Sequence, residues 1–266
     1  MSQLTITLLQ TNLHWENREA NLAMFEEKIR NIRERTEIIL LPEMFTTGFS
    51  MNAPKLAETM DGETVQWMKR MSFEKKAIIG GSIIAKEGEL YFNRFLWVLP
   101  DGSIGHYDKR HLFAYAGEDK KYTAGLRRLI ASVKGWRINL QVCYDLRFPV
   151  WARQTPGGEP EYDLLIYVAN WPEKRVHAWK TLLQARAIEN QCFVAGVNRT
   201  GDDGLGIHYS GESMVIDPLG EVLYTKKESE DIFTITLDKK MLDETREKLP
   251  FLKDGDAFMI VNSGED

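Results

Sequence analysis

The chain is poor in cysteine and in long apolar runs. Its 266 residues include two cysteines, Cys143 and Cys192, which are too few for a disulfide framework. No stretch reaches the roughly 18 consecutive apolar residues that a membrane-spanning helix needs. The first residues, MSQLTITLLQ, lack the basic start and the uninterrupted apolar run of a signal peptide. From these absences we expect a cytoplasmic protein with reduced thiols and no membrane partner.

An excess of positive charge is missing as well. The 34 Lys and Arg residues are outnumbered by 39 Asp and Glu, giving a net charge of −5, and they are scattered along the chain. A nucleic-acid-binding protein would present a basic stripe or patch. The sequence also lacks a Walker loop, a G-x-G-x-x-G after the first strand, and a His/Cys cluster at metal-ligand spacing. We therefore expect no nucleic-acid partner, no cofactor and no metal ion.

Apolar segments of two kinds alternate along the chain, in which 43% of residues are hydrophobic. Continuous or alternating β-rich runs predict strands, and a spacing of three to four residues predicts helices. Strands are expected at 5–11, 37–45, 77–85, 90–100, 129–133, 136–144, 163–171, 192–198, 213–224 and 231–238, and helices at 21–35, 64–76, 176–191 and 241–252. Because no linker, repeat or low-complexity segment interrupts this mixture, we expect one α/β domain over residues 1–266.

The helix expected at 176–191 is apolar around more than one side. Trp179, Ala185 and Ile188 widen its apolar stripe. Two interpretations stay open: a surface for a second subunit, or a helix held between two core layers.

Three chemically reactive side chains are expected at the ends of strands. Glu43 follows a buried strand in LLPEMF, Lys109 follows another in GHYDKRHLF, and Cys143 ends a third in LQVCYDLRFP. Sites in α/β sheets gather where strands end and loops begin, so these side chains can converge. Each also has a simpler interpretation: a solvated loop glutamate, a surface lysine, and a buried cysteine that serves as a small hydrophobe.

A carboxylate, an ammonium and a thiol at one place would suit acyl transfer from an amide through a thioester. The thiolate is the nucleophile, and the carboxylate takes the thiol proton and hands it to the leaving amine. The ammonium stabilises the thiolate and the oxyanion, helped by a backbone N–H. Histidine is the usual partner of a catalytic cysteine, but we interpret His111, close to Lys109, as a structural loop residue.

Together these stretches resemble the nitrilase superfamily of carbon–nitrogen hydrolases. LLPEMF, YDKRHLF and VCYDLRFP resemble its glutamate, lysine and nucleophile motifs, in the same order. The blocks VANWP, HAWKTLLQARAIENQCFVAGVNRTG and GESMVIDPLGEVL resemble those that follow the nucleophile. The resemblance spans most of the chain and implies an αββα sandwich, with two sandwiches stacked in a homodimer.

The resemblance also implies roles for individual residues. Cys143 is the expected nucleophile and Glu43 the expected general base and acid. Lys109 would stabilise the tetrahedral intermediate, and the amide N–H of Tyr144 would be a second oxyanion donor.

Members of the superfamily carry a second glutamate between the lysine and the cysteine. In AYAGEDKKYTAG this position falls on Glu118, with Asp119 as the nearby competitor. Glu118 would position Lys109 or the substrate; its simpler interpretation is a polar loop residue.

Within the superfamily, LPEMFTTGF, KRHLF, CYDLRFP, NWP and QARAIENQ are most similar to the omega-amidase branch. Its members hydrolyse the terminal amide of 2-oxo dicarboxylic acid monoamides, such as 2-oxoglutaramate and 2-oxosuccinamate. The substrate carboxylate then needs a cation, for which Arg147 and Arg175 are the candidates. Arg147 can instead pair with Asp145, and Arg175 can be simply exposed. Trp171 and Phe45 are candidates for apolar walls, or for core residues.

Other functions remain open at this stage. The enzyme alternatives are an aliphatic amidase, an N-carbamoyl hydrolase and a nitrilase, which substrate profiling separates. The alternative without catalysis is a scaffold or a redox-sensing thiol protein, in which Cys143 would be inert or merely oxidisable.

Overall fold

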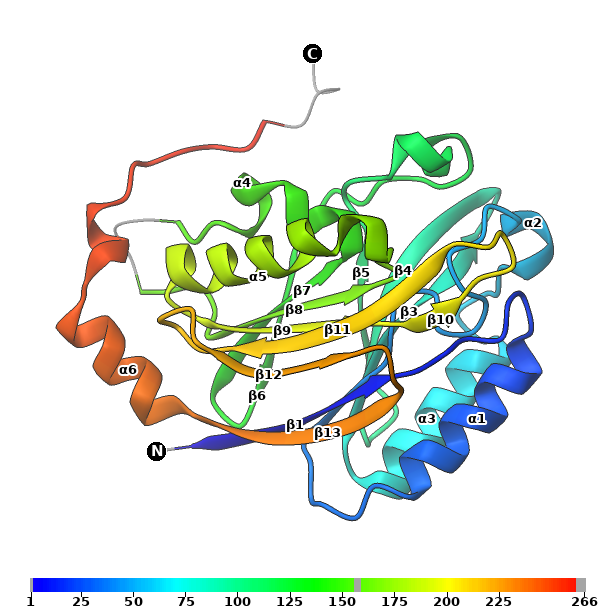
Figure 1. The fold of residues 1–266 in the computed structure, drawn as a ribbon, viewed down its shortest axis with the longest axis horizontal. Coiled ribbons are helices and arrows are strands. Elements are labelled where there is room, and N and C mark those ends of the chain that lie inside the picture. Colours follow the sequence, from blue (N-terminus) through cyan, green and yellow to red (C-terminus); the bar gives the residue numbers. More distant parts are fainter. Residues whose placement is uncertain (1, 156–158, 262–266) are drawn as a thin grey trace.

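The computed structural model describes residues 2–155 and 159–261, which form two mixed β-sheets with helices outside them (Figure 1). The first sheet has the order β13 (Asp231–Asp238), β1 (Gln3–Gln10), β2 (Ile38–Leu40), β3 (Ile78–Glu87), β4 (Leu90–Val98) and β5 (Ile104–Asp108). The second has the order β10 (Thr200–Asp202), β11 (His208–Ile216), β9 (Phe193–Asn198), β8 (Leu164–Ala169), β7 (Trp136–Val142) and β6 (Leu129–Val133), and β12 (Val222–Lys227) pairs with β11. The predicted mixed α/β class is confirmed.

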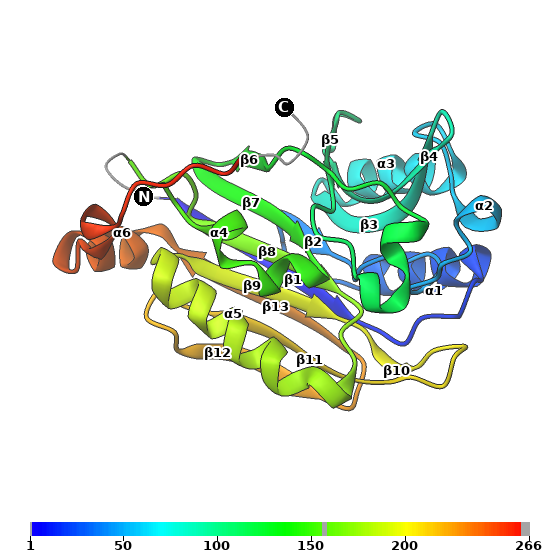
Figure 2. The same cartoon turned by 90° about the horizontal axis from the view of Figure 1, so that it is seen from above.

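Three apolar cores explain why so many strands are apolar along their whole length. One lies between the sheets and takes Ile6 from β1 and Leu140 from β7. The second joins the first sheet to α1 (Arg18–Arg30) and α3 (Glu63–Lys75), and the third joins the second sheet to α5 (Val176–Asn190). Figures 1 and 2 show α1 and α3 on one side of the paired sheets and α5 on the other. Strands covered on both faces need no polar alternation.

The remaining helices are short or terminal. They are α2 (Ala53–Leu56), α4 (Pro149–Ala152) and α6 (Lys239–Lys248). On α5, Trp179 is fully buried in the third core, which favours a core interpretation for that part of its stripe, whereas Ile188 is 54% exposed. Among the residues described, no helix is both long and apolar enough to cross a bilayer.

Several strands end earlier than their apolar runs predict, and two of them end close to a side chain that was expected to be reactive. The strand expected at 37–45 stops at Leu40, and the chain then turns, with Met44 at φ +42° and its N–H bonded to Ser82 Oγ. The strand expected at 136–144 stops at Val142, because Cys143, at φ +43°, begins a 3₁₀ helix over Cys143–Arg147. Both turns occur where a reactive side chain was expected.

Candidate active site

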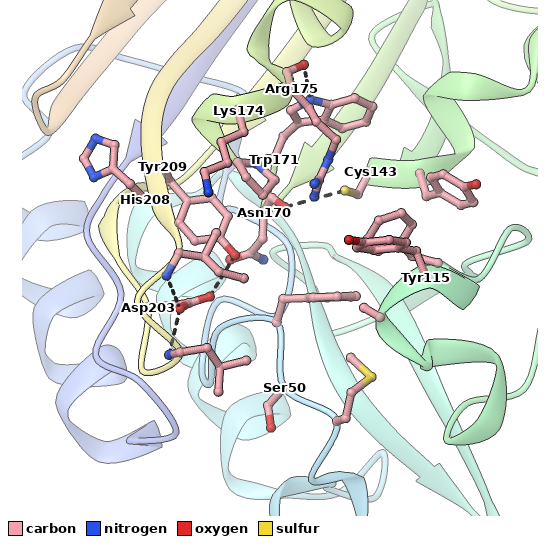
Figure 3. A pocket seen from close by; sticks show the side chains of 18 of the residues that line it. Ser50, Tyr115, Cys143, Asn170, Trp171, Lys174, Arg175, Asp203, His208 and Tyr209 are labelled. Carbon is pink, nitrogen blue, oxygen red and sulfur yellow. Dashed lines mark hydrogen bonds between the residues drawn. The ribbon is translucent and has the colours of Figure 1, made fainter.

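A cavity of about 880 Å³ opens beyond the ends of β7 and β8. Lys109, Cys143 and Asn170 contribute to its wall, and Figure 3 shows the Cys143 side chain beside Asn170 and Arg175. Its volume is in the range of small-molecule sites. Glu43 and Glu118 lie nearby, fully buried.

Lys109 lies between two carboxylates. Its Nζ donates to Glu43 Oε1 at 2.9 Å and to both Oε atoms of Glu118 at 3.0 and 2.9 Å. All three side chains are removed from solvent. The second glutamate predicted from the sequence therefore contacts the lysine, whereas its competitor Asp119 is exposed.

The charges in this cluster do not balance, and the pKa values respond. Burial by itself would lower the pKa of Lys109, but the carboxylates of Glu118 and Glu43 outweigh it and raise that pKa. Burial, followed by the charge of Glu43, raises the pKa of Glu118 against the lowering effect of Lys109. Lys109 is thus firmly an ammonium, shared between two acids.

Asn93 is a member of the site that the sequence did not reveal. Its Nδ2 donates to Glu43 Oε1 at 2.7 Å and to Glu118 Oε1 at 3.2 Å, so it bridges both carboxylates. It lies within the strand sequence LYFNRFLWV on β4. The polar pair of Asn93 and Arg94 in an otherwise apolar strand was the available signal.

Asn170, directly after β8, holds Glu43 from the other side. Its backbone N–H donates to Glu43 Oε2 at 2.8 Å, and its Nδ2 donates to the backbone oxygen of Glu43 at 2.5 Å. Asn198 supports the next residue by accepting the N–H of Trp171 at 2.8 Å. The carboxylate of Glu43 is therefore fixed by contacts on both oxygens, and this role too was missed from the sequence.

Cys143 occupies a strained position at the cavity wall. Its φ of +43° is uncommon for a residue with a side chain, and such strain persists where the surroundings enforce it. The thiol is half-buried and its Sγ lies 3.9 Å from the backbone oxygen of Asn170. Burial and then Glu43 raise the pKa of this thiol, while Lys109 lowers it. The resting thiol is thus protonated, and an attack by sulfur needs a base at that moment.

Two guanidinium groups line the same cavity. Arg147 lies over the ring of Trp171 at 4.9 Å, and Arg175 lies over the ring of Phe113 at 5.3 Å. Within the described residues neither arginine has a carboxylate partner, so the alternative pairing of Arg147 with Asp145 does not form. Both cations are available to an anion.

The aromatic side chains divide between wall and core. Trp171, a predicted wall residue, lines the cavity, and so does Tyr144, for which the sequence predicted only a role of its backbone N–H. Phe45 does not: it packs against Phe25 and Trp67, with ring centroids 5.5 and 6.0 Å away, in the core beneath α1 and α3. The expectation that Phe45 forms a wall is corrected, because the turn after β2 directs this side chain to the helix-covered face of the sheet.

His111 lies in the loop that follows Lys109. Its Nδ1 is 2.8 Å from Asp145 Oδ1, and its ring stacks on Phe148 at 3.8 Å. This placement agrees with a structural role for the histidine. The cluster thus supplies a carboxylate base, an ammonium and a thiol, which together can transfer an acyl group.

Comparison with known proteins identifies the family of this chain. The family model described as carbon-nitrogen hydrolase matches residues 5–247. Omega-amidase YafV of Yersinia enterocolitica is 48% identical over 98% of this chain and all of that protein, and 2-oxoglutaramate amidase of Bacillus subtilis is 33% identical over 94% of this chain and 96% of that protein.

A solved structure of the same superfamily superposes closely on this chain. XC1258 from Xanthomonas campestris, a CN-hydrolase superfamily protein with an arsenic adduct in its active site, is 44% identical. It superposes with a TM-score of 0.96 over 98% of this chain and all of that one. This chain belongs to the carbon–nitrogen hydrolase family.

Proposed function

We propose that this protein is an omega-amidase that hydrolyses the terminal amide of 2-oxoglutaramate or 2-oxosuccinamate to the 2-oxo acid and ammonia. The proposal is carried by the buried cluster of Glu43, Lys109 and Glu118 beside Cys143, in a cavity that also presents two guanidinium groups without a carboxylate partner among the described residues. The names of the relatives from Yersinia and Bacillus point to the same substrate class.

The proposed reaction has two halves that share one base. Sγ of Cys143 attacks the amide carbon as Glu43 takes the thiol proton, and Glu43 then returns that proton to the departing nitrogen, which leaves as ammonia. The thioester is hydrolysed when Glu43 takes a proton from water and the resulting hydroxide adds to the acyl carbon. Collapse expels the thiolate, which takes this proton from Glu43, so that the thiol and the carboxylate are both restored. The contacts that fix both Glu43 oxygens support this assignment.

The oxyanion of each tetrahedral intermediate needs donors that are already in place. We assign Lys109 Nζ and the backbone N–H of Tyr144 to this role. Tyr144 lies in the first turn of the 3₁₀ helix over Cys143–Arg147, where N–H groups lack an intrahelical acceptor. Glu118 would hold Lys109 in position, as its two contacts with Nζ suggest.

The carboxylate at the far end of the substrate is assigned to Arg147 and Arg175. Both line the cavity and both lie over aromatic rings, which hold a guanidinium in place without neutralising its charge. A third cation, Lys174, lines the same cavity. Acidic side chains line this cavity as well, so the two arginines stacked on aromatic rings, rather than its overall charge, favour an anionic substrate.

Ammonia release from 2-oxoglutaramate by the purified protein tests the proposal, with Cys143→Ala and Cys192→Ala measured beside the wild type. Cys192 is the matched control, because it is a free thiol that is fully buried in the core beneath α5. We expect release by the wild type and by Cys192→Ala, and none by a folded Cys143→Ala.

The opposite results are also informative. Equal release by both cysteine variants would contradict the thiol mechanism. No release by a folded wild type would contradict the substrate assignment, and turnover of a short aliphatic amide, an N-carbamoyl compound or a nitrile would then identify the reaction. Failure on all of these would favour a protein without catalysis.

We also propose a homodimer located in the cytoplasm. Ile188 on α5 and Val150 on α4 are apolar and more than half exposed, which favours a covering partner, and two free thiols fit a reducing compartment. Light scattering should give twice the chain mass of 30.6 kDa, and cell fractionation should find the protein in the cytosolic fraction.

A further inference from the structure

Asp145 is a buried carboxylate that the reaction described above does not use. It lies two residues after Cys143 and is fully buried. Its Oδ1 accepts from the N–H of His111 at 2.9 Å and from His111 Nδ1 at 2.8 Å. Its Oδ2 accepts from the hydroxyl of Tyr107 at 2.8 Å and from the N–H of Val142 at 3.0 Å. A buried carboxylate is costly unless hydrogen bonds satisfy it, and here both oxygens are satisfied.

The donors come from two segments that the backbone does not pair. Val142 is the last residue of β7, immediately before Cys143, in the second sheet. Tyr107 and His111 lie two residues before and two residues after Lys109, at the end of β5, the edge strand of the first sheet. Because the two strands belong to different sheets, the position of Lys109 relative to Cys143 depends on side chains. Asp145 joins the two segments directly.

The connection is itself well supported. The Tyr107 hydroxyl also accepts from Trp151 Nε1 at 2.9 Å and from the N–H of Arg110 at 3.1 Å. Burial and the neighbouring Asp145 raise the pKa of Tyr107, so its hydroxyl stays a donor. The tautomer of His111 with its proton on Nδ1 makes this contact a second donation to Asp145 Oδ1, beside that of the His111 backbone N–H.

The local backbone gives a reason for such support. Cys143 has φ +43°, and the contact from the Val142 N–H to Asp145 Oδ2 closes the turn across it. A strained residue keeps its conformation only when neighbouring contacts enforce it. The same carboxylate that closes this turn also holds both flanks of the lysine.

We propose that Asp145 is a positioning residue, which fixes the Cys143 turn and the Lys109 loop relative to one another through His111 and Tyr107. This inference rests on the roles proposed for Cys143 and Lys109. It predicts that loss of the Asp145 contacts impairs the chemical step and the reactivity of the thiol, while substrate binding is retained. A misplacement of about 1 Å can lower a rate by about 10²-fold.

The variant Asp145→Asn keeps the shape of the side chain. It replaces one carboxylate oxygen, which accepts two hydrogen bonds, by an NH₂ group that can only donate. We expect kcat for 2-oxoglutaramate to fall by about 10²-fold, with KM nearly unchanged. The second readout is alkylation of Cys143 by iodoacetamide as a function of pH, in a Cys192→Ala background. Because Lys109 lowers the pKa of the thiol, its displacement should move the alkylation midpoint to higher pH.

Asp163→Asn is the matched control. Asp163 is another fully buried carboxylate that accepts a backbone N–H, that of Arg137 at 3.0 Å, but it lies at the opposite end of β8 from the cavity. The Asp163→Asn substitution should lower the melting temperature and leave both kcat and the alkylation midpoint unchanged. Unchanged kcat in Asp145→Asn, or a loss of kcat without a shift of the midpoint, would overturn the proposal.

A second pair of variants decides the matter if Asp145→Asn does not fold. In His111→Asn, the amide Nδ2 can take the place of the ring Nδ1 as donor to Asp145, whereas His111→Ala removes this donor. We expect His111→Ala to lower kcat and raise the midpoint, and His111→Asn to restore most of both. Identical behaviour of the two would overturn the proposal. The alkylation readout needs no substrate, so it separates this inference from a wrong choice of amide.

Discussion

Two clusters of buried charge lie at opposite ends of strand β8. At its start, the carboxylate of Asp163 is surrounded by Arg137, Lys239 and Arg246, at 3.5, 3.3 and 2.9 Å. Beyond its other end, one ammonium, Lys109, is shared by two carboxylates. Positive charge is in excess in the first cluster and negative charge in the second. The cations around Asp163 also reach solvent, with side chains 39%, 17% and 11% exposed, whereas the second cluster is sealed.

The pKa shifts in the two clusters have opposite signs although both carboxylates are buried. Burial alone would raise the pKa of Asp163, but the N–H of Arg137 and the charges of Lys239 and Arg246 outweigh it and lower that pKa. For Glu118, burial and the charge of Glu43 outweigh Lys109 and raise the pKa. Since Asp163 and Glu118 are equally buried, the opposite signs of their pKa shifts follow from the balance of charges around each carboxylate and from the solvent access of the neighbouring cations.

The largest difference between the clusters should appear when each loses a lysine. Lys109→Met leaves two buried carboxylates without a cation, and removes the proposed oxyanion donor. We expect kcat to fall by about 10³-fold or more and stability by about 3–5 kcal/mol. Lys239→Met, the matched variant, should cost at most about 1 kcal/mol and leave kcat unchanged, because Asp163 keeps two arginines.

Urea denaturation and steady-state kinetics on both variants make this measurement. The double variant Lys109→Met/Glu118→Gln should regain part of the lost stability while staying inactive, because it removes one of the two unpaired acids. A Lys109→Met enzyme with kcat within tenfold of the wild type would refute the contrast drawn between the clusters.

A smaller effect, on KM, is expected when the charge of an arginine is reversed, and its size should depend on whether that arginine has a carboxylate partner. In the part of the chain that the structure describes, Arg147 and Arg175 have no carboxylate partner, whereas Arg137 pairs with Asp163. Charge reversal to Glu at either cavity arginine should raise KM for 2-oxoglutaramate by about 10- to 100-fold, the equivalent of one charged hydrogen bond. It should leave KM for a neutral short amide nearly unchanged.

Arg137→Glu is the matched control for this prediction, and it should change KM for neither substrate. Kinetics on the two amides give the answer, and the cavity arginine with the larger effect is the main carboxylate ligand. An equal loss on both substrates would argue against recognition of the carboxylate by these arginines.

The cluster around Lys109 was easier to predict from the sequence than the cluster around Asp163. Glu43 and Cys143 each follow an apolar run, because a buried strand must end where the chain turns polar, and that boundary is visible in the sequence. Lys109 follows the mixed strand IGHYD, so the motif YDKRHLF rather than an apolar run identified it. Asp163 shows no such signal. Its partner Arg246 lies 83 residues away along the chain, and only the packing of α6 against the start of β8 brings them together.

Side-chain direction was the other limit. Phe45 lies two residues after Glu43, yet one points to the core and the other to the site, because the strand that would have set their alternation ends at Leu40. Asn93 is hidden for a related reason: its contacts depend on the pairing of β4 with β5, which places Lys109 beside it. Local periodicity carries no information about such neighbours across a sheet.

The smallest expected effects are two opposite dependences of stability on pH. Because the folded pKa of Asp163 is lowered, the unfolded chain binds more protons there as pH falls, and the stability that Asp163 contributes is lost as pH falls through its folded pKa. Asp163→Asn should therefore be less stable than the wild type at neutral pH, and the difference should shrink in acid. A shift of one pKa unit corresponds to about 1.4 kcal/mol.

Glu118 should show the reverse. Its folded pKa is raised, so the folded chain binds more protons than the unfolded chain between the ordinary carboxyl pKa and the raised one. Wild-type stability should fall as pH rises through this interval, and in Glu118→Gln that fall should be absent. Urea midpoints from acid to neutral pH, for the wild type and both variants, give the two slopes. Slopes of the same sign would mean that burial alone, rather than the balance of charges around each acid, sets the protonation of these two carboxylates.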